Sequence, residues 1–341
     1  MKHAMRLHPA YTLEQLHQYL AVPASSRPLV SYQPDSLEPE NAFSEKESAR
    51  LREIVDSGDG VYPKAKVSKL LIDLSWASSR LEGNTYTYLD TQTLIEYGQR
   101  NEDKPLEEAA MILNHKRAIE FILTHSTLTV DTIQQIHALL ADNTLAPNSR
   151  HFLEKDRCGV IRSYTPEGFE IDGFSYLPPQ AEGRPPGFIT AQLDRLIEAT
   201  HTLDSPVNQS FFLMTRLPYL QPFYDANKRT SRIGCNIPLI SRGLTPMSFV
   251  DFDKGRYLAG MIAFYELGDE RLAKDAFLDA YLSSAFRYLP FTEAQRVILA
   301  TEKDQHVADA KRFILEGVME NTPIWRKKAS DAPLRPSVAP P

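Results

Sequence analysis

Apolar residues recur at three- and four-residue spacing over most of this chain, and this spacing predicts helices. The clearest stripe lies in residues 66–84 and consists of Val67, Leu70, Leu71, Leu74, Ala77 and Leu81. Gly83 and Asn84 follow it and tolerate the left-handed conformation in which many helices end. Similar patterns predict further helices at 44–56, 91–99, 106–124, 129–141, 188–202, 205–220, 227–240, 254–267 and 270–288, with one or two more in 292–320.

The spacing changes in one segment, residues 157–179. Two short β-prone runs, 159–162 and 169–177, flank the turn-rich residues 164–168. We therefore expect a small β-hairpin there. The chain as a whole is predicted to be mainly α, a helical bundle with this one hairpin.

The elements suggest three consecutive parts. Residues 1–108 would form an N-terminal arm and helices, residues 109–290 a core domain, and residues 291–341 a C-terminal helix with a tail. The tail is rich in proline from about residue 327 and should be disordered. A chain of 341 residues is long enough for one large or two modest domains.

Composition and charge argue against several classes of protein. The 42% hydrophobic and 24% charged residues are typical of a globular protein, and the net charge of −6 argues against a general nucleic-acid binder. No apolar run could span a bilayer, and the N-terminus has no leader-like segment. Cys158 and Cys235 form neither a disulfide framework nor a metal-ligand cluster, so we expect a cytoplasmic protein. The sequence leaves the oligomeric state, including a homodimer, open.

The most informative stretch is residues 221–232, a short loop between two predicted helices. The residues where the second helix begins are Asp225, Asn227, Lys228 and Arg229. The first turn of a helix has unpaired N–H groups and the positive end of the dipole. Cations added there make an anion site, for which phosphate is the expected ligand. The alternative is an ordinary solvated helix start.

This stretch, Gln-Pro-Phe-Tyr-Asp-Ala-Asn-Lys-Arg-Thr-Ser-Arg, resembles the Fic family signature His-Pro-Phe-x-[Asp/Glu]-Gly-Asn-[Gly/Lys]-Arg-x-x-Arg. The matching residues are Pro222, Phe223, Asp225, Asn227, Lys228, Arg229 and Arg232. Gln221 stands where the family has histidine, and Ala226 where it most often has glycine. The form Asp-Ala-Asn-Lys-Arg is closer to the Doc branch. The resemblance implies a Fic-like helical fold in which the hairpin of residues 157–179 is a flap beside the loop.

The resemblance also implies a nucleotide, ATP or ADP with Mg²⁺, as the ligand of this loop. Fic proteins move AMP from ATP onto a protein Ser, Thr or Tyr hydroxyl, and the Doc branch moves the γ-phosphate. A target-protein segment would add to the flap as a strand. Asp225 would be the Mg²⁺ ligand. The implied nucleotide-binding residues are Asp225, Ala226, Asn227, Lys228, Arg229 and Arg232.

The general base of the family is missing, because Gln221 replaces the histidine and cannot accept a proton at any pH. A positioned base contributes typically ~10²–10⁴-fold. Three interpretations stay open. The one we favour is a nucleotide-binding protein with weak or no transfer. The others are an active AMP or phosphate transferase that uses another base, and a protein-interaction module with a vestigial anion site.

A second motif lies at the end of the first long helix. Glu82 at a helix C-terminus is disfavoured by the helix dipole by roughly 0.3–1 kcal/mol, so a cationic partner is expected unless the residue is simply solvated. Ser78-Ser79-Arg80-Leu81-Glu82-Gly83 resembles the Fic inhibitory motif [Ser/Thr]-x-x-x-Glu-[Gly/Asn]. The resemblance implies autoinhibition in which Glu82, with Ser78 and Gly83, holds Arg232 away from the γ-phosphate. We interpret His115 and His137 as surface or hydrogen-bonded core histidines rather than catalytic ones.

Overall fold

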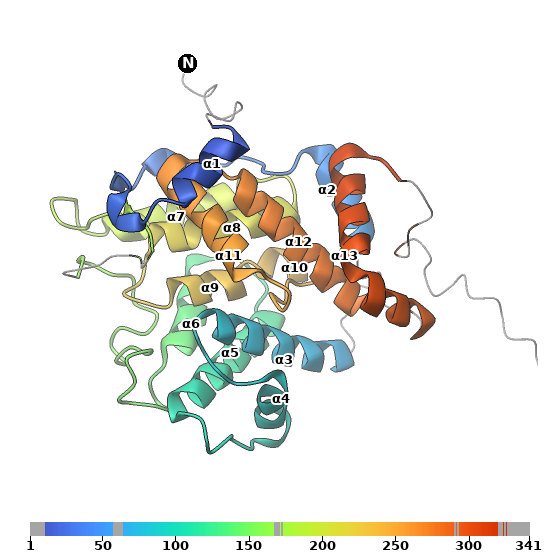
Figure 1. The fold of residues 1–341 in the computed structure, drawn as a ribbon. Helices are drawn as coiled ribbons and strands as arrows, with labels where there is room; N and C mark the ends of the chain where they lie inside the picture. The colour runs from blue at the N-terminus through green and yellow to red at the C-terminus, as the bar shows by residue number, and fades with distance from the viewer. Residues whose placement is uncertain are drawn as a thin grey trace, which may run out of the picture.

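The fold is given by a computed structural model, which describes residues 11–56, 64–166, 171, 173–289, 291, 293–319, 323 and 325. Helices dominate this part of the chain, and a two-stranded sheet accompanies them (Figure 1). The prediction of a mainly α fold is confirmed. The predicted disorder of residues 327–341 lies outside the described residues.

The helices agree closely with the hydrophobic pattern. The predicted helix 227–240 is two helices, which break just before Pro238, because proline fits the first turn of a helix but not its interior. The helices are α1 Leu13–Leu20, α2 Glu45–Val55, α3 Lys64–Leu81, α4 Tyr88–Tyr97, α5 Leu106–Thr124, α6 Val130–Ala141, α7 Phe188–Thr202, α8 Pro206–Leu220, α9 Asn227–Gly234, α10 Ile237–Ser241, α11 Lys254–Leu267, α12 Arg271–Tyr288 and α13 Glu293–Glu316, with 3₁₀ turns at Ala24–Ser26 and Pro34–Leu37.

The sheet is not the hairpin expected between 159–162 and 169–177. Strand β2, Tyr176–Leu177, pairs in parallel with β1, Val30–Ser31, from the N-terminal part of the chain. Residues 159–162 form no strand, because the main chain and side chain of Arg162 bond to the loop that follows α8 instead. Residues 167–170 and 172 of the expected hairpin lie outside the described residues.

The core is built around α8, whose side chains are buried on nearly every side. Phe211 of α8 packs edge-on against Phe43 and Phe277, which brings the segment before α2 and the middle of α12 onto the same helix. Figure 1 shows α9 lying between this upper group of helices and a lower group that contains α3, α5 and α6. The loop between α8 and α9 is therefore held from two sides.

Helix α3 is anchored midway along its length by Asp73. This carboxylate is fully buried and accepts hydrogen bonds from Arg287 Nε at 2.5 Å, Tyr88 Oη at 2.7 Å and Tyr288 Oη at 2.6 Å. The anchor links α3 to α4 and α12. Helix α3 ends at Leu81, and Gly83, two residues later, has a φ of +96°, the left-handed conformation predicted there.

Among the described residues, no helix is both long enough and apolar enough to cross a membrane.

Candidate functional site

The loop between α8 and α9 is shaped by the side chain of Asn227. Gln221 and Ala226, at its two ends, both have positive φ, at 49° and 56°. Asn227 Oδ1 accepts the Phe223 N–H at 3.0 Å, and Asn227 Nδ2 donates to Gln221 Oε1 at 2.8 Å and to the Phe223 carbonyl at 2.9 Å. One buried amide therefore satisfies the polar groups that the turn leaves unpaired, which explains an asparagine at this position.

Two residues outside the loop, Arg162 and His137, hold it in place by hydrogen bonds to its main chain. Arg162 is buried and donates from Nε to the Gln221 carbonyl at 2.7 Å, while its main-chain N–H donates to the Pro222 carbonyl at 2.9 Å. His137 of α6 stacks on the ring of Phe223, with 3.9 Å between the centroids, and donates from Nε2 to the Asp225 carbonyl at 3.1 Å. The carbonyls of Gln221, Pro222 and Asp225 are thereby all engaged in hydrogen bonds from residues outside the loop.

His137 stays neutral in this position. Its Nδ1 accepts the Gly159 N–H at 2.9 Å, so the ring has its proton on Nε2. Burial lowers the pKa of His137 to about 3, with a further lowering from the charge of Arg229, although the bond to Asp225 opposes the shift. The interpretation of His137 as a hydrogen-bonded core histidine is confirmed, but its position under the loop was not evident from the sequence.

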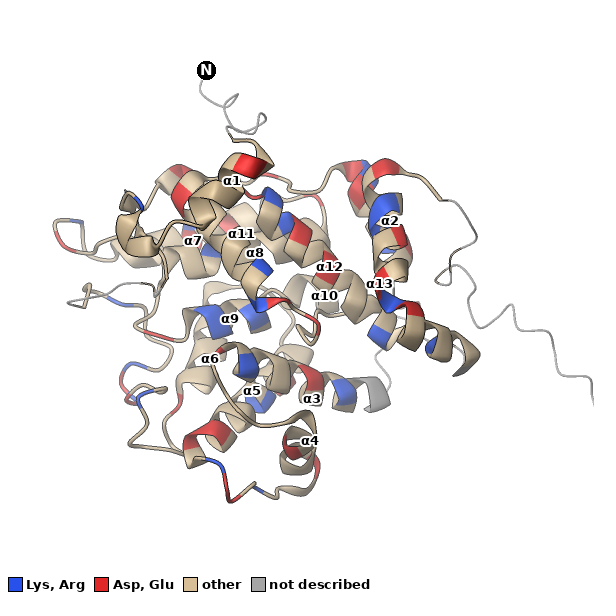
Figure 2. Ribbon diagram, in the orientation of Figure 1, with Lys and Arg blue, Asp and Glu red and all other residues tan. Residues whose placement is uncertain are grey.

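A hollow of about 150 Å³ opens in front of the loop. Figure 2 shows cationic segments in both halves of α9, which begins at this hollow. Ile171 was not singled out by the sequence motifs, and it belongs to the segment in which the flap was expected. The residues that line the hollow are Glu82, Ile171, Gln221, Asp225, Ala226, Asn227, Lys228 and Arg229. The loop residues predicted to bind nucleotide thus come together, except Arg232.

Arg229 is a fixed charge at the base of the hollow. Its side chain is 4% exposed, and its guanidinium donates to the His151 carbonyl at 2.9 Å and approaches Asp225 Oδ2 at 3.5 Å. Lys228 lies over the ring of Phe174, with 5.5 Å between its Nζ and the ring centroid. Both residues belong to the first turn of α9, where backbone N–H groups add positive potential.

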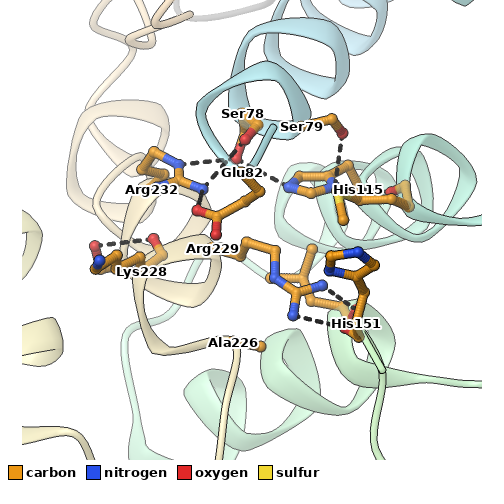
Figure 3. Close-up of polar contacts among 12 residues, drawn as sticks. Ser78, Ser79, Glu82, His115, His151, Ala226, Lys228, Arg229 and Arg232 are labelled. Atoms are coloured by element: carbon orange, nitrogen blue, oxygen red, sulfur yellow. Dashed lines mark hydrogen bonds and ion pairs between the residues drawn. The ribbon is translucent and has the colours of Figure 1, made fainter. Parts of the chain in front are cut away.

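Arg232 lies behind Glu82 and is fully buried (Figure 3). Arg232 Nη2 donates to Glu82 Oε1 at 2.5 Å and to the Ser78 carbonyl at 3.2 Å, and Arg232 Nε donates to Ser78 Oγ at 2.9 Å. The last turn of α3 therefore occupies the guanidinium through a carboxylate, a carbonyl and a hydroxyl. Glu82 stands between Arg232 and the hollow.

His115 of α5 completes this buried network. Its Nδ1 donates to the Met111 carbonyl at 2.8 Å, which leaves Nε2 to accept from Ser78 Oγ at 2.9 Å. Burial lowers the pKa of His115 to about 3, so the ring is neutral. Ser78 can then donate to His115 while it accepts from Arg232. The prediction of a hydrogen-bonded core histidine is confirmed, and its link to Arg232 is new.

Glu82 is ionised well below its ordinary range. Burial raises its pKa, but the charges of Arg232 and Arg229, the hydrogen bond from Arg232 and the charge of Lys228 outweigh burial and lower the pKa to about 2 from an ordinary 4.5. The folded state therefore binds a proton here less readily than the unfolded state does. This ion pair stabilises the protein above pH 4.5, and the contribution disappears as the pH falls towards 2.

We expect Glu82→Gln to lower the free energy of unfolding at pH 7 by about 1–3 kcal/mol, because Arg232 stays buried without its counter-charge. Urea denaturation at pH 7 and pH 3 measures the effect, and the difference between wild type and variant should shrink at pH 3. Glu120→Gln, which removes the partner of Lys116 on the surface, is the control and should change stability by less than about 0.5 kcal/mol. An equal loss for Glu82→Gln at both pH values would contradict the ion-pair explanation.

Gln221 has both ends of its side chain engaged. Its Nε2 donates to the Pro218 carbonyl at 2.7 Å, while its Oε1 accepts from Asn227. His151, a second histidine near the loop besides His137, contributes its main-chain carbonyl to Arg229. In the part of the chain that the structure describes, no histidine lines the hollow.

Asp225 is the carboxylate available to a divalent ion. Its side chain is 52% exposed at the hollow, with Oδ1 accepting the Ala226 N–H at 2.6 Å. Among the described residues, no three His, Cys, Asp or Glu side chains gather as a metal cluster. One exposed carboxylate suits Mg²⁺, which is commonly held by one or two carboxylates together with the phosphates of its ligand. The residues present therefore fit a magnesium ion that is held together with phosphate groups.

Residues 127–239 match the Fic/DOC family model. The protein adenylyltransferase fic-1 of Caenorhabditis elegans is 22% identical to this chain over 202 residues, which are 56% of this chain and 36% of the relative. The chain thus spans about a third of the length of the curated relative it matches.

Two solved structures share the fold. The structure of C. elegans Fic-1 (aa 134–508) aligns with a TM-score of 0.55 at 19% identity, over 71% of this chain and 70% of that one. A Fic family protein from Desulfovibrio desulfuricans G20 aligns with a TM-score of 0.55 at 18% identity, over 83% and 82% of the two chains. The chain therefore contains a Fic/DOC family domain at residues 127–239, and this domain contains the loop between α8 and α9.

Proposed function

We propose that the loop between α8 and α9 binds the phosphates of ATP or ADP together with Mg²⁺. The observation that carries this proposal is the convergence of Lys228, Arg229 and the first turn of α9 on one hollow, with the carboxylate of Asp225 at its edge. Backbone N–H groups and fixed cations are the usual phosphate-binding groups of proteins. The curated relative is named a protein adenylyltransferase, which supports a nucleotide as the ligand.

Each residue would have a distinct task. Arg229, already held by the His151 carbonyl, would donate to a phosphate without further ordering, and Lys228 would supply a second positive charge. Asp225 would hold the ion that neutralises the phosphates. Transfer of AMP to a protein hydroxyl depends chiefly on positioning and on stabilising charge in the transition state, and these groups supply both.

We propose that the domain is autoinhibited through Glu82. The contact of its carboxylate with Arg232 keeps this guanidinium from a γ-phosphate in the hollow. A nucleotide that recruited Arg232 would have to displace an ion pair supported by two further bonds from Arg232 to Ser78. In this proposal Gly83 ends α3 so that Glu82 faces α9.

Weak or absent transfer is the outcome that the geometry favours. Gln221 is committed to two hydrogen bonds and cannot remove a proton from a hydroxyl. Burial holds His115 and His137 neutral at sites outside the hollow, which argues against either as a substitute base. In this proposal a target segment approaches the hollow beside Ile171, in the part of the chain where the flap was expected.

We expect Arg229→Ala to weaken Mg-ATP binding by roughly 10- to 150-fold, the cost of a charge-assisted hydrogen bond of about 1.5–3 kcal/mol. Titration calorimetry with wild type, Arg229→Ala and Arg229→Lys measures this, and the lysine variant should retain part of the affinity. Lys116→Ala is the matched control, since it removes one positive charge outside the hollow. Unchanged affinity in Arg229→Ala would exclude the phosphate role. Absence of binding in both wild type and Glu82→Gly would favour an interaction module.

A further inference from the structure

A second hollow, of about 200 Å³, lies between α3, α12 and α13. Helix α3 contributes Lys69 to this hollow, and Lys69 lies near the start of α3, far from Glu82 at its C-terminal end. Phe286 of α12 and Leu299 of α13, both buried, form an apolar floor. The two hollows have no lining residue in common.

The walls of this hollow have an excess of positive charge. Its lining cations are Lys69, Arg287, Arg296 and Lys303, and its lining carboxylate is Asp251. Asp251 pairs with Lys303 at 2.5 Å, and Asp73 of α3, which does not line the hollow, pairs with Arg287 at 2.5 Å. Two of the four charges are thereby neutralised.

Lys69 and Arg296 form no ion pair with a carboxylate among the residues that the structure describes, although Asp73 lies near enough to Lys69 to act on its charge. Lys69 Nζ donates to the Arg287 carbonyl at 3.3 Å, and Arg296 Nη2 donates to the Leu289 carbonyl at 3.3 Å. Carbonyls satisfy one donor each but cancel no charge, and a lysine has three donors and an arginine five. The hollow therefore has two uncompensated positive charges with donors to spare.

The environment of Lys69 is consistent with this surplus. Partial burial lowers the pKa of Lys69, and the charges of Arg287 and Arg296 lower it further, while Asp73 opposes them. Cations gathered in a half-buried hollow repel one another, and an anion bound between them would relieve this cost.

We propose that this hollow binds a phosphate monoester. A monoester carries close to two negative charges at neutral pH, which matches the two unneutralised cations. Arg296 offers forked donors to its oxygens and Lys69 a point charge, while Arg287, whose Nε and Nη2 bond to Asp73, adds Nη1. The floor of Phe286 and Leu299 takes the organic group. The site stands independently of the α8–α9 loop and of the nucleotide proposed there.

Titration calorimetry with phenyl phosphate tests this proposal, using the full chain and the variants Lys69→Met and Arg296→Ala. Lys69→Met keeps the aliphatic stem, and Arg296 is exposed, so both variants should fold. We expect each to weaken phenyl phosphate binding at least fivefold. Lys116→Ala, which changes a cation outside both hollows, should leave that affinity within twofold of wild type. Arg229→Ala is measured beside it to distinguish this hollow from the α8–α9 loop.

Three results would overturn the site. The first is that the wild type does not bind phenyl phosphate. The second is a loss of affinity in Arg229→Ala alone, which would place the ligand at the α8–α9 loop, and the third is an equal loss of affinity in Lys116→Ala, which would show an effect of net charge. Titration with inorganic phosphate, which has no organic group, tests whether that group contributes to binding. Tighter binding of phenyl phosphate supports a monoester, and equal affinities overturn that part of the proposal.

Discussion

Asp73→Ala is expected to lower the free energy of unfolding by about 3–5 kcal/mol, the cost of breaking a buried charge pair by removing one partner. The carboxylate is fully buried and accepts from Arg287, Tyr88 and Tyr288. Its removal leaves the Tyr288 hydroxyl and part of the Arg287 guanidinium desolvated without an acceptor. It also removes the hydrogen bonds that Asp73 makes from α3 to α4 and to α12.

Urea denaturation followed by circular dichroism measures this loss. Asp194→Ala is the matched control, because Asp194 is exposed on α7, and it should change stability by less than about 0.5 kcal/mol. Asp73→Asn should fall between the two, since an amide accepts some of these bonds without the charge. Equal, small losses for Asp73→Ala and Asp194→Ala would show that Asp73 is not an anchor.

Gln221→His, made in a Glu82→Gly background, is expected to raise transfer from ATP by ~10²–10⁴-fold, the usual contribution of a positioned general base. Glu82→Gly frees Arg232, and histidine restores the proton acceptor that the resemblance to the Fic signature leads us to expect at this position. Intact-mass measurement after incubation with Mg-ATP follows the reaction. An adenylyl-sized increment indicates AMP transfer, and a phosphoryl-sized one indicates the Doc-like reaction.

Gln221→Ala in the same Glu82→Gly background is the control for this experiment. It removes the amide that bonds to Pro218 and Asn227 without adding a base, so any gain from a looser loop would appear there as well. A gain equal to that of the histidine variant would contradict the general-base explanation. An adenylyl increment on Glu82→Gly alone, as large as on the double variant, would show that another base is present.

Much of the fold was predictable because it depends on local spacing. The stripe in residues 66–84 became α3, Gly83 took the left-handed conformation, and the cations of residues 228–229 gathered at the start of α9. These features follow from contacts within one or two helical turns, which a periodic pattern records directly. The pairing of Glu82 with Arg232 was expected only from the resemblance, and the structure places the two residues in contact.

The rest depends on contacts between distant parts of the chain. The β1–β2 pairing joins residues 30–31 to 176–177, and strands of two residues have too little alternation to predict a partner. Arg162 and His137 brace the α8–α9 loop through main-chain carbonyls, which leave no mark on the sequence of the loop. The second hollow, between α3, α12 and α13, likewise draws one or two cations from each of these helices.

The anchor at Asp73 determines what kind of motion could free Arg232. Asp73 and Glu82 are nine residues apart on α3, roughly 13 Å at 1.5 Å per residue. Because the middle of the helix is tied to α4 and α12, swinging α3 outward as a rigid rod would break the Asp73 contacts. Unwinding the last turn, next to Gly83, would break only the local bonds around Ser78 and Glu82. Release would then resemble the fraying of a helix end, a small and rapid local opening, and would leave the packing of the bundle unchanged.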